Sequence, residues 1–404
     1  MKILQINAVY GKGSTGRTTK ELHEYLLNCG VTSYVACSDI AGLSENTYKI
    51  GNIIDRKAHA VLSRFTGKQG YFSKAATKKL IRFIDNIAPD IIHLRNLHGN
   101  YIHIPMLLKY IIDNKIATVI TLHDCWFYTG KCMLYIEFNC NKWTDKCGHC
   151  PALKQGNKSY FFDCSTSMLK DKEKYLSSID RLAVIGVSQW TTNDVKKSIL
   201  KNAMIIKCIY NWIDLDQFRP RNGSEYCTKL RLEDKFIILG VASKWTKQKG
   251  IHIFWEIANM LPDDCHIVLV GGVPENIQAN KKITYIGEMN DVRLLSEIYS
   301  MADVFVNPTI METFGKTNAE ALASGIPVIA YNSTAAPELI GRNGKCGFLV
   351  DNNSAKEYLK NILLVKAKGK NFFASEARRR AELLFSKEDN IKKYYEVYKM
   401  LLDG

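Results

Sequence analysis

Two glutamates, Glu312 and Glu320, lie eight residues apart in the segment 307–330, NPTIMETFGKTNAEALASGIPVIA. This segment predicts a strand end, a loop that presents Glu312, and a helix over residues 316–324. Gly315 would let the first N–H groups of that helix face a diphosphate, whose charge the helix dipole favours. Glu320, further along the helix, can accept hydrogen bonds from a pair of ribose hydroxyls. The spacing alone carries little information, and the whole context makes a nucleotide diphosphate the expected ligand.

A glycine-rich turn, GKGSTG, spans residues 11–16, after an expected strand and before an expected helix. Gly11, Gly13 and Gly16 have the G-x-G-x-x-G spacing of a dinucleotide-binding turn, in which glycine lets the backbone approach a pyrophosphate. Asp39 lies near the end of the next expected strand, as the acid of such a site would. We expect this turn to approach a phosphate or a sugar. NAD binding and a flexible turn without a ligand are the alternatives.

Four of the twelve cysteines cluster within residues 125–164 in the spacing C-x7-C-x6-C-x2-C, namely Cys132, Cys140, Cys147 and Cys150. Four thiolates could close a tetrahedral structural zinc site and fix an otherwise long insertion. Only the last pair has the spacing of a zinc knuckle. Ordinary reduced cysteines, and a redox pair at Cys147 and Cys150, are the alternatives.

The formal net charge of +15 predicts an acidic partner: nucleic acid, an anionic membrane surface or a phosphorylated substrate. Residues 56–82 carry eight lysines and arginines and no acid, and Leu62, Phe65, Tyr71 and Phe72 lie among them. Such a mixture is typical of a surface that docks on anionic lipid headgroups. A solvated helical face would have the same composition, and that alternative stays open here.

The elements that must position these residues alternate between apolar strand-like runs and helical stretches, as in α/β proteins with parallel sheets. The first expected set of strands is 3–9, 32–37, 91–94 and 118–122. The second expected set is 236–242, 266–270, 283–286, 304–306 and 328–330. We therefore predict an N-terminal Rossmann-like domain over 1–211, a C-terminal one over 222–385 and a C-terminal helix over 386–404. Residues 211–222 form the expected seam.

At this point the sequence resembles the retaining glycosyltransferases of family 4, in which an E-x7-E signature precedes small residues, Gly and Pro-Val. The resemblance covers nearly the whole chain. Its further marks are the turn at 11–16, the segment TLHD with His123, GVSQW with Ser188, the linker 211–218, and KQKG at 247–250. It implies an α/β chain with the GT-B fold, in which two Rossmann-like doubly wound domains face each other across a cleft.

The resemblance also implies roles for individual residues. It assigns Glu312 to the donor sugar, Glu320 to the nucleotide ribose, and Lys249 to the diphosphate. The residues implied to line the sugar and diphosphate are Phe314, Gly315, Lys316 and Thr317. His123 would lie near the transferred sugar, with a core histidine as the alternative. Lys244 stands where such enzymes usually have arginine, so the phosphate would meet a point charge instead of a bidentate fork.

Three hypotheses follow. The first is a retaining, hexosyltransferase-type enzyme that uses a nucleotide-sugar donor and a glycan or lipid-linked acceptor. Its cations and helix N–H groups would stabilise the departing diphosphate without a catalytic metal. The second is an NAD-dependent oxidoreductase that uses the turn at 11–16, which leaves 307–330 unexplained. The third is a zinc-stabilised nucleic-acid-binding protein, which gives Glu312 no role; the first hypothesis expects no nucleic acid.

The expected location is the cytoplasm, with peripheral attachment to the inner face of the plasma membrane. The start of the chain lacks an apolar run long enough for a signal peptide. No uninterrupted run of 18 or more apolar residues indicates a membrane span.

Overall fold

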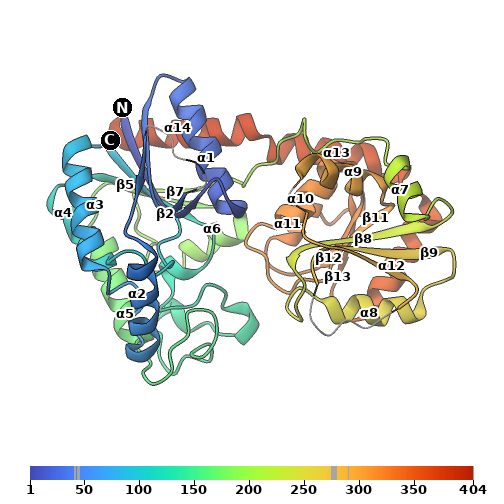
Figure 1. Ribbon diagram of the computed structural model, residues 1–404, viewed down its shortest axis with the longest axis horizontal. Helices are drawn as coiled ribbons and strands as arrows, with labels where there is room; N and C mark the ends of the chain where they lie inside the picture. The colour runs from blue at the N-terminus through green and yellow to red at the C-terminus, as the bar shows by residue number, and fades with distance from the viewer. Residues whose placement is uncertain (41, 43–45, 274–279, 290, 404) are drawn as a thin grey trace. The chain divides into compact units, whose positions relative to one another are not determined.

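The computed structural model describes residues 1–40, 42, 46–273, 280–289 and 291–403. The chain divides into two compact units, Met1–Ile209 with Ile391–Gly404, and Tyr210–Asn390. Each unit is a parallel sheet flanked by helices (Figure 1). No helix within the described residues is both long and apolar enough to cross a membrane.

The first unit contains a parallel sheet in the order β3-β2-β1-β4-β5-β6-β7. Its strands are β1 Lys2–Tyr10, β2 Thr32–Ile40, β3 Thr47–Lys49, β4 Ile91–Leu94, β5 Ala117–Leu122, β6 Leu182–Gly186 and β7 Ile205–Cys208. Its helices are α1 Gly13–Asn28, α2 Ile53–Thr66, α3 Lys74–Ile87, α4 Ile104–Asp113, α5 Ser165–Leu176 and α6 Gln189–Val195. Strands β4, β5 and β6 are buried along their whole length, as parallel strands covered on both faces must be.

The second unit contains a parallel sheet in the order β10-β9-β8-β11-β12-β13. Its strands are β8 Phe236–Lys244, β9 Cys265–Gly272, β10 Ile283–Ile286, β11 Val304–Asn307, β12 Val328–Tyr331 and β13 Gly347–Val350. Its helices are α7 Ser224–Leu230, α8 Ile251–Met260, α9 Val292–Met301, α10 Lys316–Ala323, α11 Ala336–Ile340, α12 Ala355–Lys368 and α13 Asn371–Phe385. Its core lies between the sheet and helices such as α8 and α12, with Phe254 and Tyr358 fully buried.

Both sheets have the doubly wound strand order, in which the direction of strand addition reverses once. The reversal lies between β1 and β4 in the first unit and between β8 and β11 in the second. In such sheets, ligands bind outside the carboxyl ends of the strands at the point of reversal. The predicted pair of Rossmann-like α/β domains is confirmed. The topology of each sheet indicates a ligand site at the carboxyl ends of its strands, at the point of reversal.

The C-terminal helix α14, Lys387–Asp403, returns to the first unit, where Figure 1 shows it in red with the blue and green elements. Two of its tyrosines bond to side chains of the first sheet. Tyr398 Oη lies 2.7 Å from His93 Nδ1 on β4, and Thr121 Oγ1 on β5 donates to Tyr394 Oη at 3.1 Å. The helix therefore braces β4 and β5 from a distant part of the chain.

Candidate active site

The central contact of the second unit joins Lys249 to Glu312. Lys249 Nζ lies 2.7 Å from Glu312 Oε1, and both side chains are partly exposed. Gly250, with φ of 77°, makes this approach possible, because a Cβ atom there would lie 2.4 Å from Pro308 Cγ. The turn after β8 thus packs against the loop after β11, which brings a cation and a carboxylate together at the point of strand reversal.

The main chain of Glu312 is fixed by the segment that follows β12. Its N–H group donates to Thr334 Oγ1 at 3.0 Å, and the N–H group of Ala335 donates to the Glu312 carbonyl at 3.4 Å. Thr334 has φ of 50°, a left-handed conformation that is uncommon for a β-branched residue. Backbone strain of this kind is found where surrounding structure enforces it, and here it serves to hold the loop that carries Glu312.

Helix α10 begins directly after this loop. Gly315 precedes it in the left-handed region, with φ of 89°, and a Cβ atom there would lie 3.0 Å from Asn318 Nδ2. Asn307 Nδ2 donates to Asn318 Oδ1 at 2.9 Å, which ties the end of β11 to the first turn of the helix. Lys316 and Thr317 are half-buried in that turn. The N–H groups of Lys316 and Thr317 lie at this helix N-terminus, where the sequence predicts an anion, and the N–H group of Asn318 donates to the Gly315 carbonyl at 3.0 Å.

Glu320 lies on the buried side of α10 and accepts a hydrogen bond from Tyr299 of α9. The Tyr299 hydroxyl donates to Glu320 Oε2 at 3.0 Å, and both side chains are buried. Burial, together with the charge and hydrogen bond of Glu320, raises the pKa of Tyr299 well above its ordinary value. Tyr299 therefore remains a donor and orients the carboxylate. It was missed from the sequence, because a tyrosine in an amphipathic helix carries no distinguishing signal.

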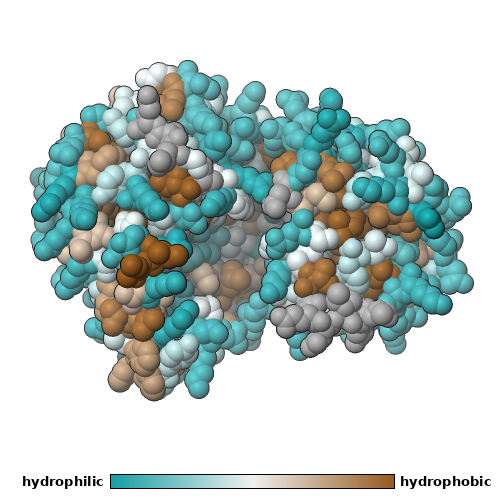
Figure 2. Space-filling view, viewed as in Figure 1, coloured by the Kyte–Doolittle hydropathy of each residue, from teal (hydrophilic) through white to brown (hydrophobic). Residues whose placement is uncertain are grey.

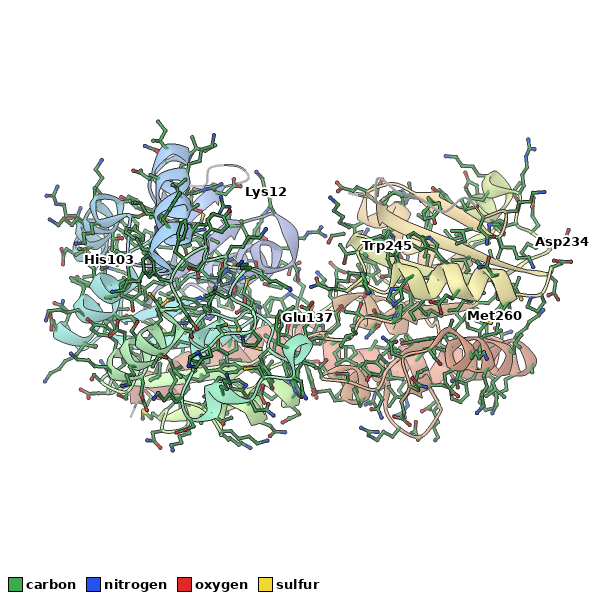
Figure 3. The ribbon with its side chains drawn as sticks, turned by 90° about the horizontal axis from the view of Figure 1, so that it is seen from below. Lys12, His103, Glu137, Asp234, Trp245 and Met260 are labelled. Atoms are coloured by element: carbon green, nitrogen blue, oxygen red, sulfur yellow. The ribbon has the colours of Figure 1, made fainter. Side chains whose placement is uncertain are left out.

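Two predicted donor-site residues differ in exposure. The ring of Phe314 is 2% exposed and packs against Tyr210 and Phe385, with centroids 6.3 and 5.4 Å away. A ligand at this position would therefore meet the main chain of Phe314. Lys244 is exposed at the end of β8. The next residue, Trp245, is labelled in Figure 3, and its indole is buried in the core.

In the first unit, the glycine turn connects β1 to α1. Gly11 and Gly13 have positive φ angles of 72° and 59°, and the N–H group of Gly11 donates to the carbonyl of Gly16 at 2.9 Å. Lys12, labelled in Figure 3, pairs with Asp39 at 3.2 Å. The acid that an NAD site would use for the ribose is therefore engaged by a lysine of the turn itself.

His123 follows β5 and contacts Arg95, which follows β4. Arg95 is fully buried, and its Nε group donates to His123 Nε2 at 3.2 Å. Its other nitrogens bond to Gln5 and to Thr18 and Thr19 of α1. Burial lowers the pKa of His123 well below its ordinary value, and the charge of Arg95 lowers it further. His123 is therefore neutral, with Nε2 as acceptor and the proton on Nδ1.

Arg95 also connects the two predicted features of the first unit, since it bonds both to the helix after the glycine turn and to His123. A second pair lies beside it. His98 Nε2 is 2.7 Å from Asp124 Oδ2, and both side chains are largely buried. Burial acts to lower the pKa of His98, but the charge and hydrogen bond of Asp124 outweigh it and raise that pKa above the ordinary value. Neither Arg95 nor His98 was identified from the sequence.

The four clustered cysteines line one small cavity in the first unit. Cys132 Sγ and Cys150 Sγ are 3.9 Å apart. Among the described residues, no group of three or more His, Cys, Asp or Glu side chains is already arranged to hold a metal ion.

Two Rossmann-like units in one chain are the architecture of the GT-B class of protein. In this chain, charged side chains or helix N–H groups lie at the point of strand reversal of each unit. The Glycosyltransferase Family 4 model matches residues 15–217, half of the chain, and the Glycosyl transferases group 1 model matches residues 225–381. The chain therefore belongs to glycosyltransferase family 4.

Similar proteins support the same assignment. The chain is 26% identical over 196 residues to the alpha-maltose-1-phosphate synthase of Mycolicibacterium smegmatis, a match that covers 44% of this chain and half of that protein's length. Sucrose-phosphate synthase from Thermosynechococcus elongatus has a similar structure, with a TM-score of 0.73, 16% identity and coverage of 100% and 99%. Anabaena Alr3699/HepE, determined in complex with UDP, has a TM-score of 0.69, 17% identity and coverage of 99% and 100%. The two structural likenesses establish the fold alone.

Proposed function

We propose that this chain transfers a sugar, with retention of anomeric configuration, from a nucleotide-diphosphate sugar to a glycan or lipid-linked acceptor. The observation that carries the proposal is the contact between Lys249 and Glu312 beside the N-terminus of α10. A cation, a carboxylate and a helix N-terminus lie together at the carboxyl end of the sheet. The cation and the helix N-terminus would bind the diphosphate and stabilise the negative charge that develops on it, and the carboxylate would accept hydrogen bonds from sugar hydroxyls.

When the bond between sugar and diphosphate breaks, negative charge grows on the departing phosphate. Lys249 and the first N–H groups of α10 would stabilise that charge, with Lys244 as a second cation at the end of β8. Glu312 would separate from Lys249 as the donor binds and would accept hydrogen bonds from hydroxyls of the transferred sugar. Retention fits transfer on one face of the sugar, with a phosphate oxygen taking the acceptor proton.

Glu320 would hold the ribose, because its carboxylate is buried and already oriented by Tyr299. In the first unit, neutral His123 would lie beside a hydroxyl of the sugar or the acceptor. Its geometry depends on Arg95, which holds Nε2. The glycine turn at 11–16 would allow a close approach of the backbone to the substrate.

A donor panel tests this proposal. UDP, GDP and their sugars should protect the protein against thermal unfolding, by about 2.7 kcal/mol at a concentration 100 times the dissociation constant. The cognate sugar should also be hydrolysed slowly in the absence of an acceptor. Protection by NAD or by duplex DNA without protection by any nucleotide diphosphate would contradict the proposal and favour one of the two other hypotheses.

We also propose an anionic membrane surface as a partner of the first unit. Helix α2 exposes Ile53, Ile54, Val61, Leu62 and Phe65, and the neighbouring loop exposes Tyr160, Phe161 and Phe162. The rings of Phe65 and Phe161 stack, with centroids 5.6 Å apart. Figure 2 shows brown side chains gathered over the position of α2. We call these eight side chains the α2 patch.

Cations surround the α2 patch. Lys57, Arg64 and Lys68 are exposed, and none of them has an ion-pair partner among the described residues. Apolar side chains next to unpaired cations suit the boundary between acyl chains and anionic headgroups. Tyr71 and Phe72, which the sequence suggested as further lipid contacts, are instead partly buried against Asp171 and His59.

Vesicle co-sedimentation tests the membrane proposal. Binding should require anionic lipid and fall steeply with salt, because each cation near the surface contributes about 1 kcal/mol. Phe161→Ser should weaken binding severalfold. Leu383→Ser, at an equally exposed leucine of α13, is the matched control and should leave it unchanged. Equal binding to neutral vesicles, or equal losses in both variants, would refute the proposal.

A further inference from the structure

The segment 125–164 follows β5 and contains little regular structure. Its described elements are three short 3-10 helices, Trp126–Tyr128, Ile136–Phe138 and Lys142–Thr144. Long segments of this kind are uncommon inside compact domains without a covalent or metal constraint. This segment also ends in the aromatic loop of the α2 patch, so its shape determines where those rings lie.

Four cysteines of this segment share one cavity. Cys132, Cys140, Cys147 and Cys150 all line one cavity, together with buried aromatic side chains. The Sγ atoms of Cys132 and Cys150 are 3.9 Å apart. Two thiolates bound to one tetrahedral zinc ion, with Zn–S bonds of about 2.3 Å, are about 3.8 Å apart. A disulfide would require about 2.05 Å. The observed spacing excludes a disulfide, and it fits both two thiols in contact and two ligands of one ion.

The C-x2-C turn at 147–150 is built around its sulfur atoms. Gly148 and His149 both have positive φ angles, which fold the turn so that its two cysteines line the same cavity. The N–H group of Gly130 donates to Cys147 Sγ at 3.3 Å. The main chain of Gly130 therefore holds the sulfur atom of Cys147 at the cavity.

The turn is also held from outside the cavity. Thr166 Oγ1 donates to the carbonyl of Cys147 at 2.6 Å, and the N–H group of Cys150 donates to Asp163 Oδ2 at 2.7 Å. These contacts anchor the turn to the start of α5. The position of the turn is therefore set by the rest of the fold and does not depend on the cysteines alone.

Three lysines stand close to the four sulfurs. Lys131 and Lys172 are nearly fully buried, which is rare for lysine, and Lys142 lines the cavity with Lys131. Lys172 Nζ donates to the carbonyls of Trp126 and Thr129 at 2.5 and 2.8 Å, and no carboxylate among the described residues forms an ion pair with it. Four thiolates around one Zn²⁺ have a net charge of about −2. Buried lysines at this place would offset that charge.

We propose that Cys132, Cys140, Cys147 and Cys150 bind one structural zinc ion that holds segment 125–164 in shape. Cys132 and Cys150 already have ligand spacing, and the side chains of Cys140 and Cys147 close onto the ion as it binds. All four positions are occupied by protein, so the ion is closed to substrate and takes no part in sugar transfer. The inference is independent of the transferase proposal.

Metal analysis of the full chain, purified with reductant and without chelator, is the primary test. About one zinc per chain is expected for a single closed site. Alkylation followed by mass spectrometry should find these four of the twelve cysteines protected until a chelator is added. A folded, zinc-free protein in which all four thiols react, or one with a disulfide between Cys132 and Cys150, would overturn the proposal.

Variants then separate ligands from neighbouring cysteines. Cys140→Ser and Cys147→Ser should each lower zinc content at least tenfold, whereas Cys164→Ser should retain one zinc. Cys164 is the matched control, because it lies in the same segment but does not line the cavity. Retention of zinc by Cys140→Ser would rule out the four-cysteine site. If the variants do not fold, cobalt in the wild-type protein should give the intense thiolate-to-metal absorption of four sulfur ligands; weak bands would overturn the proposal.

Discussion

The two charged clusters of this protein differ in how their charges are balanced. In the second unit, Lys249 and Glu312 neutralise each other, and their side chains are 36% and 21% exposed. In the first unit, Arg95 is fully buried, and its hydrogen bonds go to the neutral groups of Gln5, Thr18, Thr19 and His123. The cluster of the second unit is therefore a hydrated pair of opposite charges, whereas the cluster of the first unit is a cation inside a fixed polar network.

This difference separates binding from positioning. A partly exposed ion pair contributes little to the free energy of folding. Lys249 can therefore separate from Glu312 and bind a phosphate, and Glu312 can bind a sugar hydroxyl, at a small cost in free energy. Arg95 cannot exchange its partners, because any that it leaves become buried and unsatisfied. We infer that the second unit rearranges around the donor, whereas the first unit presents a rigid surface containing His123.

The largest expected effect comes from Glu312→Gln. The rate of transfer should fall about 100- to 1000-fold, because the carboxylate would accept hydrogen bonds from more than one hydroxyl of the transferred sugar, each worth about 1.5 to 3 kcal/mol. Binding of the bare nucleotide diphosphate should stay constant or tighten, because Lys249 loses its competing partner. Steady-state kinetics and calorimetry measure the two quantities. Glu376→Gln, at an ion-paired glutamate of α13, is the control. Wild-type transfer in Glu312→Gln would place the donor site elsewhere.

Replacement of Lys249, the other residue of the ion pair, should affect binding of the nucleotide diphosphate itself. Lys249→Ala should weaken binding of the nucleotide diphosphate by about 1.5 to 3 kcal/mol, or tenfold to a hundredfold, because a charged hydrogen bond to phosphate is lost. Binding of the nucleoside should change little. Lys247→Ala, at an exposed lysine of the same turn, controls for general charge. Equal losses at both positions would show that Lys249 acts only through long-range attraction.

Most of the fold could be predicted, because buried parallel strands are short apolar runs between turn residues. Strands β4 and β10 have the predicted bounds, whereas β8 is longer than predicted by two residues and β9 by three. The three-residue strand β3 and the partly exposed strand β7 were not predicted. The fully buried strand β6 and the partly buried strand β13 were also omitted, although β6 is as apolar as its neighbours.

The site was predictable only where its residues are close in sequence. Gly315 and Glu320 belong to one helix, and their relation follows from its pitch. Three other residues act through hydrogen bonds to distant positions, which no local pattern indicates. The partner is 21 positions away for Tyr299, 22 for Thr334 and 28 for Arg95. The roles of Glu312, Glu320, Lys249 and His123 stay predictions, and the structure adds the groups that hold three of them.

Tyr299→Phe tests one of those added groups and should have a smaller effect. It removes one hydrogen bond to Glu320, worth about 0.5 to 1.5 kcal/mol, so nucleotide affinity should fall about two- to tenfold. Glu320→Ala should cost about tenfold to a hundredfold, since it removes the ribose contact itself. With a nucleotide that lacks both ribose hydroxyls, the two variants should bind as the wild type does. A Tyr299→Phe loss that persists with this nucleotide would indicate a general packing role.

The smallest expected effect concerns the pair His98 and Asp124 and the pH dependence of stability. Because the folded state raises the pKa of His98 above its ordinary value of 6.5, the pair stabilises the fold fully below that value. The contribution, on the order of 1 kcal/mol, should be lost as pH rises through the pKa of the folded state. Chemical unfolding from about pH 5.5 to pH 9 should show this loss in the wild type and not in Asp124→Asn. A difference between the two proteins that grows with pH would contradict the assignment, because it would mean that the folded state prefers neutral His98.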